Sequence, residues 1–203
     1  MEIKKIVSEF MESNVFVLKK DGFAIIIDAG AKLQEVQKAV GSAKVLAVLL
    51  THAHFDHCFY ANEYAKIFNC PIFMHEEGQQ IASDPQKNYG ENFAISDFSN
   101  FHLFSGDCRL TLPPFDVEVI TTAGHSPCST CYKIQNHLFA GDTLFSNGIG
   151  RTDLIASDKN AMIASLDKLS KIDFDVVYSG HGDESDYARQ QRNVTLFKRF
   201  LSR

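Results

Sequence analysis

A continuous apolar run, KVLAVLL at residues 44–50, constrains the fold of this chain more than any other segment. Its length is that of one strand, and it lacks the polar alternation of a strand with one face in water. A strand of this kind must be covered on both faces. The run therefore predicts a layered architecture that contains both strands and helices.

Segments on both sides of this run alternate between strand-like and helix-like patterns, in a similar order in both halves. An Asp-Gly turn between residues 14–20 and 23–30 predicts a hairpin, and Asp158 is a candidate helix N-cap. The expected strands are residues 14–20, 23–30, 44–51, 70–75, 109–112, 115–122, 129–135 and 137–145, and the first part of 173–183. The expected helices are residues 31–41, 58–69, 158–170 and 186–202.

This order predicts an α/β fold of the four-layer α+β kind, an αββα sandwich of two mixed β-sheets with helices on the outer faces. We expect one domain over residues 1–203, a length sufficient for one substantial core. Residues 82–104 mix turn residues with phenylalanines. They predict either a functional surface loop or a meandering connection whose aromatic rings pack on the core.

The composition excludes several classes of partner. A formal net charge of −5 argues against nucleic acid, because phosphate binding needs a basic surface. No apolar run reaches the roughly 18 residues of a membrane-spanning helix, and MEIKKIVSEF lacks the apolar core of a signal peptide. The five cysteines are an odd number, which argues against a disulfide framework. We expect a cytoplasmic protein with reduced thiols that binds neither nucleic acid nor a membrane.

The apolar run ends in THAHFDH, which brings His52, His54, Asp56 and His57 together in a chain with eight histidines. A polar surface turn is one interpretation. Burial of these groups without partners is costly, whereas a divalent metal would satisfy imidazole and carboxylate together. The cluster therefore predicts a metal site.

Three later stretches supply further candidate ligands, each at the end of an expected strand. TTAGHSP contains His125, FAGDTLF contains Asp142, and YSGHGDE contains His181. Sites in α/β proteins gather where strand ends meet loops, so we expect these side chains to join the first cluster.

The ordered series THAHFDH, AGH, AGDTLF and SGHG resembles the motifs of the metallo-β-lactamase superfamily. GIGRTDL at residues 148–154 is similar to the small hydrolases related to glyoxalase II. The resemblance covers nearly the whole chain and implies the metallo-β-lactamase fold. It also implies two divalent metal ions, zinc with iron or manganese as alternatives, and a bridging hydroxide that Asp56 orients as a catalytic residue. The implied ligands are His52, His54 and His125 for the first metal, Asp56, His57 and His181 for the second, and Asp142 as the bridge.

The chain departs from this motif pattern in two places. Cys58, Phe59 and Tyr60 stand where the resemblance implies small residues, and Cys128 replaces a glycine after His125. Cys58 and Cys128 are both expected to border the site. Cys128 and Cys131 form a C-x-x-C pair, which predicts either a zinc or redox site or, for Cys131, a core side chain in a strand.

Two further residues have alternative interpretations. Arg151 would bind an anionic group of the substrate or pair with an acid in its own loop. Asp28 would support a ligating imidazole from behind or serve as an ordinary turn residue. His75, His102 and His137 match no motif and are expected to be structural or surface residues.

The resemblance implies hydrolysis of an acyl thioester such as S-lactoylglutathione. Because the chain ends soon after SGHGD, we expect no C-terminal helical domain that would hold glutathione. An iron persulfide dioxygenase is the alternative, followed by a lactonase or an RNA-processing nuclease. Asp142 argues against a β-lactam substrate, because true β-lactamases of this superfamily lack a bridging aspartate there. The expected partner is a small-molecule substrate, with the oligomeric state open between monomer and homodimer.

Overall fold

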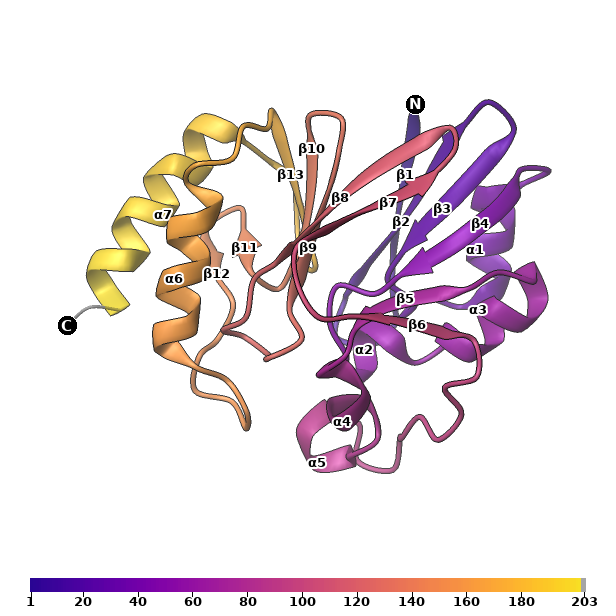
Figure 1. Ribbon diagram of the computed structural model, residues 1–203, viewed down its shortest axis with the longest axis horizontal. Coiled ribbons are helices and arrows are strands. Elements are labelled where there is room, and N and C mark those ends of the chain that lie inside the picture. Colours follow the sequence, from indigo (N-terminus) through magenta and orange to yellow (C-terminus); the bar gives the residue numbers. More distant parts are fainter. Residues whose placement is uncertain (202–203) are drawn as a thin grey trace.

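The computed structural model describes residues 1–201, which form two six-stranded β-sheets packed face to face (Figure 1). Both sheets contain parallel and antiparallel pairs. The first sheet, in spatial order, is β1 (Glu2–Val7), β2 (Asn14–Lys20), β3 (Phe23–Ile27), β4 (Lys44–Leu49), β5 (Ile72–His75) and β6 (Phe101–Phe104). The second is β14 (Ser185–Asp186), β13 (Val176–Ser179), β10 (His137–Gly141), β9 (Thr130–Ile134), β8 (Phe115–Thr121) and β7 (Cys108–Leu112).

Helices cover both outer faces, which completes the expected αββα sandwich (Figure 1). α1 (Leu33–Val40) and α3 (Ala61–Phe68) pack on the first sheet, and α6 (Lys159–Leu169) and α7 (Tyr187–Leu201) pack on the second. A separate two-stranded hairpin consists of β11 (Leu144–Phe145) and β12 (Gly148–Ile149). The other helices are α2 (Phe55–Cys58), α4 (Gly78–Ala82) and α5 (Pro85–Asn88).

The two-residue period of the strands divides the apolar side chains between the layers. In β2, Phe16 and Leu18 enter the core between the sheets, whereas Val15 and Val17 enter the core beneath α1 and α3. β4 divides in the same way, so both of its faces are buried. This explains why the sequence of β4 is continuously apolar.

The sheets are joined directly at one end of the sandwich. The Thr130 amide donates to the Thr51 carbonyl at 2.8 Å, and the Asn14 amide donates to the Gly180 carbonyl at 2.7 Å. These bonds connect the loops that follow β4 and β13 to the opposite sheet. Within residues 1–201, no helix is both long enough and apolar enough to cross a membrane.

Most of the predicted elements are present, with differences that have physical causes. The hairpin, α6 and its N-cap at Asp158 are confirmed. The expected helix at residues 58–69 begins earlier, at Phe55, and is divided into α2 and α3. The edge strands β1 and β6 were not predicted. Most of their side chains are partly or fully exposed, so their sequences lack the apolar pattern of an interior strand.

The segment at residues 82–104 contains the end of α4, then α5 and β6, and is therefore not a single loop. Phe93, Phe98 and Phe101 are partly buried against the core beneath the helices. This agrees with the interpretation of this segment as a connection whose aromatic rings pack on the core. Tyr89 from the same segment lines a cleft at the end of the sandwich, so the connection also has a wall-forming role.

Candidate metal centre

The seven candidate ligands converge at the end of the sandwich where the two sheets are joined. Four of them lie in the loop after β4 and at the start of α2, and the other three follow β8, β10 and β13. Because β4 belongs to one sheet and the other strands to the second, neither sheet forms the site alone. In three groups, ligand atoms lie within 4.8 Å of one another: His52, His54 and His125; His52, His57 and Asp142; Asp56, His57 and His181.

Backbone carbonyls orient two of the imidazole rings. The Nδ1–H of His125 donates to the carbonyl oxygen of Arg151 at 3.1 Å, and the Nδ1–H of His181 donates to that of Met11 at 3.0 Å. A carbonyl can only accept, so in the neutral ring the proton lies on Nδ1. In that neutral form each ring presents a bare Nε2 to the site, as metal binding requires.

A buried carboxylate orients two more rings from behind. Asp28, which has a left-handed φ of +63° at the end of β3, accepts from His57 Nδ1 at 2.9 Å and from the Thr51 hydroxyl at 2.9 Å. The Thr51 hydroxyl proton is thus engaged, so this oxygen accepts from His52 Nδ1 at 3.1 Å. Asp28 therefore fixes His57 directly and His52 through Thr51, which is the supporting role considered from the sequence.

Asp142 lies between the two sets of histidines. Its Oδ1 is 3.4 Å from His57 Nε2, and its Oδ2 is 3.4 Å from His125 Nε2 and 3.5 Å from His181 Nε2. Asp56 Oδ2 lies 3.3 Å from His181 Nε2 and 3.4 Å from His57 Nε2. The Asp142 carboxylate thus lies close to nitrogens of both sets of histidines, as a bridging ligand must.

Burial and charge divide the pKa values within the site. Burial, with the neighbouring imidazoles, lowers the pKa of His52 and lowers that of His54 to about 3, so both rings are neutral at pH 7. Burial opposes protonation of His57 and His181 as well, but in the metal-free site adjacent carboxylates raise the pKa of His57 and raise that of His181 to about 9. For Asp142, burial raises the pKa, and the positive charge of His57 and other histidines outweighs it.

The donor atoms fit divalent metal ions. His57 Nε2 and His181 Nε2 lie 3.2 Å apart, and His125 Nε2 and His54 Nδ1 lie 3.0 Å apart. Two ring nitrogens at such distances need a proton or a cation between them. His52 Nε2 and Asp142 Oδ1 are buried and have no hydrogen-bond partner among the described residues. Such atoms are costly to bury, and a bound cation would satisfy them.

Close backbone packing holds Asp142 in place. A Cβ atom on Gly180 would lie 2.1 Å from Asp142 Oδ1 and 2.9 Å from His57 Cε1. A Cβ atom on Gly150 would lie 1.9 Å from the Asp142 carbonyl oxygen. Any larger residue at either position would displace the carboxylate or its backbone.

The centre opens into a cleft of about 400 Å³. Arg151 stands at its rim and donates to both carboxylate oxygens of Asp153, at 2.9 and 3.0 Å, so the loop pairing considered from the sequence is present. Besides candidate ligands, the described residues that line the cleft are Met11, Phe55, Tyr89, Arg151, Asp153, Leu154 and Ile155.

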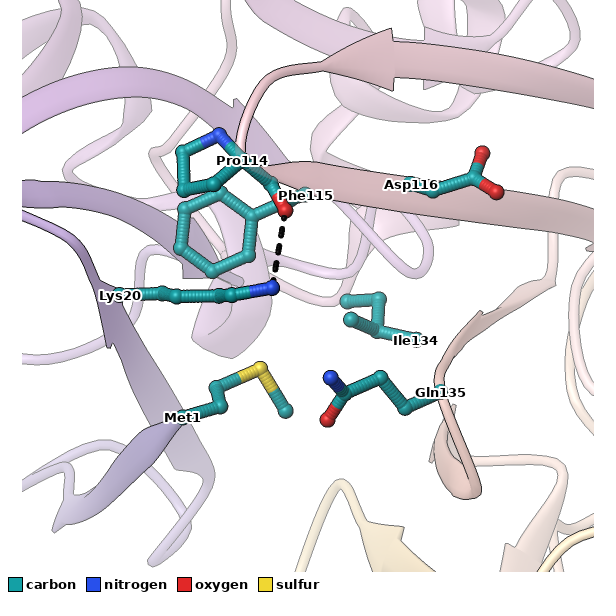
Figure 2. Close-up of a pocket in the computed structure, with 7 residues that line it drawn as sticks. All are labelled: Met1, Lys20, Pro114, Phe115, Asp116, Ile134 and Gln135. Atoms are coloured by element: carbon teal, nitrogen blue, oxygen red, sulfur yellow. Dashed lines mark hydrogen bonds between the residues drawn. The ribbon is translucent and has the colours of Figure 1, made fainter.

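A second cavity, of about 200 Å³, lies at the opposite end of the sandwich (Figure 2). Lys20 donates to the Pro114 carbonyl across it at 3.4 Å, and Phe115 and Ile134 form part of its wall. Its lining contains none of the candidate ligands. We therefore place the chemistry of this protein in the larger cleft.

The cysteines do not take part in the cleft. Cys58 and Cys128 are fully buried in the core beneath the helices and do not line it, so the expectation that they border it is wrong. Burial raises the pKa of both thiols, that of Cys128 to about 11. Cys131 is a core side chain, as its strand position indicated. All five cysteines are free thiols.

Some positioning residues were missed in the sequence. The Thr51 hydroxyl orients His52, and the Met11 backbone carbonyl orients His181. Every residue type has a backbone carbonyl, so the sequence cannot indicate which one accepts such a bond. A glycine at position 180, directly before His181, was the one available signal for the close approach to Asp142. Within the described residues, none of the three metal-compatible groups includes His75, His102 or His137.

The sequence and the fold have clear matches among known proteins. The chain is 31% identical over 190 residues to "Probable metallo-hydrolase YqgX" of Bacillus subtilis (strain 168), with 89% of this chain and 90% of that protein covered. The crystal structure of BLEG-1 B3 metallo-beta-lactamase superposes with a TM-score of 0.89 at 30% identity, over 96% of this chain and 99% of that chain. TTHA1623 in a di-iron-bound form, 23% identical with a TM-score of 0.81 over 94% of this chain and 98% of that chain, shares the fold.

The family model of the metallo-beta-lactamase superfamily matches residues 9–181, a range that contains all seven candidate ligands. The protein therefore belongs to the metallo-beta-lactamase superfamily.

Proposed function

We propose that this protein is a metal-dependent hydrolase and that its substrate is an acyl thioester. The observation that carries the hydrolase proposal is the convergence of the seven ligand side chains at the base of an open cleft, with the Nε2 atoms of His125 and His181 directed inward. The similar Bacillus subtilis protein is named a probable metallo-hydrolase, which supports the reaction class.

The residues divide into two candidate sets that share one carboxylate. When bound, divalent metals lower the pKa of water toward about 7 and polarise a carbonyl oxygen, which is the chemistry that hydrolysis needs. Asp28 and Thr51 keep two of the imidazoles in the ligating tautomer, and Asp56 places a carboxylate where it can accept a proton. The proposed sets are His52, His54 and His125, then Asp56, His57 and His181, with Asp142 shared.

The polar groups of the cleft favour a thioester. Outside the ligand set, the described cleft residues offer three polar side chains: Tyr89, Arg151 and Asp153. Arg151 and Asp153 bind each other, and the Tyr89 hydroxyl accepts from the Ile155 amide at 2.5 Å. Because the Tyr89 hydroxyl accepts in this bond, it keeps its own proton and is the only one of the three that could act as a proton donor. A thiolate needs none, because its modest pKa lets it depart unprotonated, whereas an amine must be protonated to leave.

The test is turnover of S-lactoylglutathione and a second acyl thioester by zinc-loaded protein, with release of free thiol as the measurement. Chelator-treated protein is the control. We expect release that depends on metal and is restored by zinc. Release no faster than that of the chelated protein, for both substrates, would reject the thioester proposal.

β-Lactam hydrolysis is a competing candidate, because the 30% identity to BLEG-1 extends over nearly the whole chain. Asp142 weighs against it, since the resemblance implies that lactamases of this superfamily lack this bridging carboxylate. A chromogenic cephalosporin in the same assay separates the two. A kcat/KM for the cephalosporin above that for every thioester tested would favour the lactamase.

A persulfide dioxygenase remains the second alternative. His52, His57 and Asp142 form one of the compact groups, and two histidines with one carboxylate are the donors of non-haem iron oxygenases. Metal analysis after growth with balanced iron and zinc, together with oxygen uptake on glutathione persulfide, addresses it. One iron per chain with oxygen uptake would favour the dioxygenase over the hydrolase.

A further inference from the structure

We propose that the cleft selects thioesters whose thiol portion is uncharged and apolar, and that Asp153 enforces this selection by neutralising Arg151. The inference rests on the proposed hydrolase function and adds the substrate class. It follows from the charges, the apolar walls and the hydrogen bonds at the rim of the cleft.

The charges at the rim cancel each other. Among the described residues that line the cleft, Arg151 is the sole lysine or arginine. Its Nε and Nη2 atoms donate to the two carboxylate oxygens of Asp153 at 2.9 and 3.0 Å. This bidentate arrangement uses the face of the guanidinium that would otherwise meet a substrate carboxylate. The Nε–Nη2 edge is thus occupied, and an anion at the rim would meet a cation whose charge Asp153 offsets.

Four further residues of the wall are apolar, and two of them are largely exposed. Met11 is 71% exposed and Ile155 is 54% exposed, and both line the cleft together with Phe55 and Leu154. Large apolar side chains that gather at the mouth of a cleft mark a binding surface. Their contact with an apolar ligand would remove this area from water.

Hydrogen bonds hold these walls in place without a ligand. The Met11 carbonyl accepts from His181, so this residue is fixed to the candidate metal centre itself. The Tyr89 hydroxyl accepts from the Ile155 amide and connects the loop after α5 to the loop at residues 151–156. The Leu154 amide donates to the Ser157 hydroxyl at 2.9 Å. The apolar surface is thus preformed, which lowers the entropic cost of binding.

Glutathione is a poor match for this rim. A glutathione carboxylate that reached the Arg151–Asp153 pair would meet a net charge of zero and would lose water for little gain. A small neutral thiol carries no such charge and would leave the apolar walls in contact with the acyl and thiol chains. We therefore expect esters of neutral thiols to be preferred.

The test uses thioethers, which bind like thioesters but cannot be hydrolysed. Binding of S-butylglutathione and S-butyl-N-acetylcysteamine is measured by calorimetry with zinc-loaded protein and repeated with metal-free protein, which separates any contact of a carboxylate with metal. Wild-type protein should bind the neutral thioether more tightly. Asp153→Asn should tighten binding of the glutathione thioether by about three- to five-fold at low salt, less as salt is added.

Two further variants test whether any gain in affinity comes from the freed charge of Arg151. Asp116→Asn removes the acid of an exposed pair with Arg109 at the far end of the sandwich and should change neither affinity. Adding Arg151→Gln to Asp153→Asn should abolish the gain, because the freed cation is lost. Tighter binding of the glutathione thioether by wild-type protein, or equal affinities in wild type and Asp153→Asn, would overturn the inference.

Hydrolysis of the matching butyryl thioesters gives the second readout. A higher kcat/KM for the N-acetylcysteamine ester than for the glutathione ester, with the gap narrowed in Asp153→Asn, would support both proposals. Hydrolysis of neither ester would reject the thioester function. The thioether affinities would still decide whether the rim discriminates by charge, so the two failures are distinguishable.

Discussion

The two ends of the β-sandwich are both hollowed, yet they are built from different groups. At one end, loops after β4, β8, β10 and β13 bring seven histidine and aspartate side chains together beneath a cleft of about 400 Å³. At the other end, the β7–β8 and β9–β10 turns and the end of β2 enclose a cavity of about 200 Å³ lined by Lys20, Phe115 and Ile134, among others (Figure 2). Among the described residues, His52 Nε2 and Asp142 Oδ1 at the first end are buried without a hydrogen-bond partner, as is His137 Nδ1 beside Ile134 at the second. The second end differs in that Phe115 and Ile134 of its lining belong to the core between the sheets.

This difference shows how the fold separates stability from chemistry. Phe115 and Ile134 belong to the core between the sheets and stabilise the fold at the far end. Buried polar groups such as His52 and Asp142 lower stability at the near end unless a cation satisfies them. Substitutions at the near end should therefore change metal content and activity, whereas substitutions at the far end should change the free energy of unfolding.

Asp142→Ala should lower hydrolysis by about a thousand-fold and reduce the metal content per chain, because the shared carboxylate reaches both sets of histidines. Elemental analysis and thiol release measure the two effects. Asp116→Ala, at the far end, should leave both unchanged. Wild-type activity in Asp142→Ala would remove the two-metal proposal.

Phe115→Ala should destabilise the protein by about 3–5 kcal/mol, because it removes a ring from the core between the sheets. Urea unfolding of metal-free protein measures this change. Phe200 is 70% exposed, so Phe200→Ala is the matched control and should cost less than about 0.5 kcal/mol. The metal content of folded Phe115→Ala should equal that of wild type. A large loss of metal would show that the two ends are not independent.

Asp28→Asn should weaken metal binding by about 10- to 100-fold, because the amide is a poorer acceptor for His57 and no longer carries a compensating charge. Competition with a coloured chelator gives the affinity. The fold should persist, since the amide has nearly the same shape as the carboxylate. Unchanged affinity would mean that packing alone orients the His57 ring.

Asp107, which lies near the His125 loop, should make a small, pH-dependent contribution to the free energy of unfolding. Burial raises its pKa, but hydrogen bonds from Lys168 and Thr121 outweigh burial and hold the pKa below the ordinary value of 3.8. The folded state therefore gains stability above about pH 4 and loses it as the pH falls through the lowered pKa.

Asp107→Asn should consequently cost a few tenths of a kcal/mol at pH 7, since solvent screens this partly exposed network, and nearly nothing at pH 2. Urea unfolding at the two pH values measures the difference. A cost that is equal at both would mean that the charge of Asp107 is irrelevant.

Much of the fold and of the candidate site was predictable from local patterns. KVLAVLL was predicted to be covered on both faces, and β4 has one helix-covered face and one face toward the second sheet. Asp158 was recognised as an N-cap because capping is local. β1 and β6 were missed because edge strands bury few side chains and so leave little pattern. Cys58 and Cys128 were misplaced because proximity in sequence to a ligand does not determine which way a side chain points.

The sequence alone determined which residue types could bind metal, and in which order they occur along the chain, because imidazole and carboxylate chemistry belongs to the residues themselves. Only the tertiary structure decided which nitrogen each ring presents and whether Arg151 is available to a substrate. Both depend on partners distant in sequence or on loop geometry: the Met11 carbonyl for His181, Asp28 for His57, and Asp153 for Arg151. A hydrogen bond is set by distance and direction between atoms, and the folded chain alone fixes these.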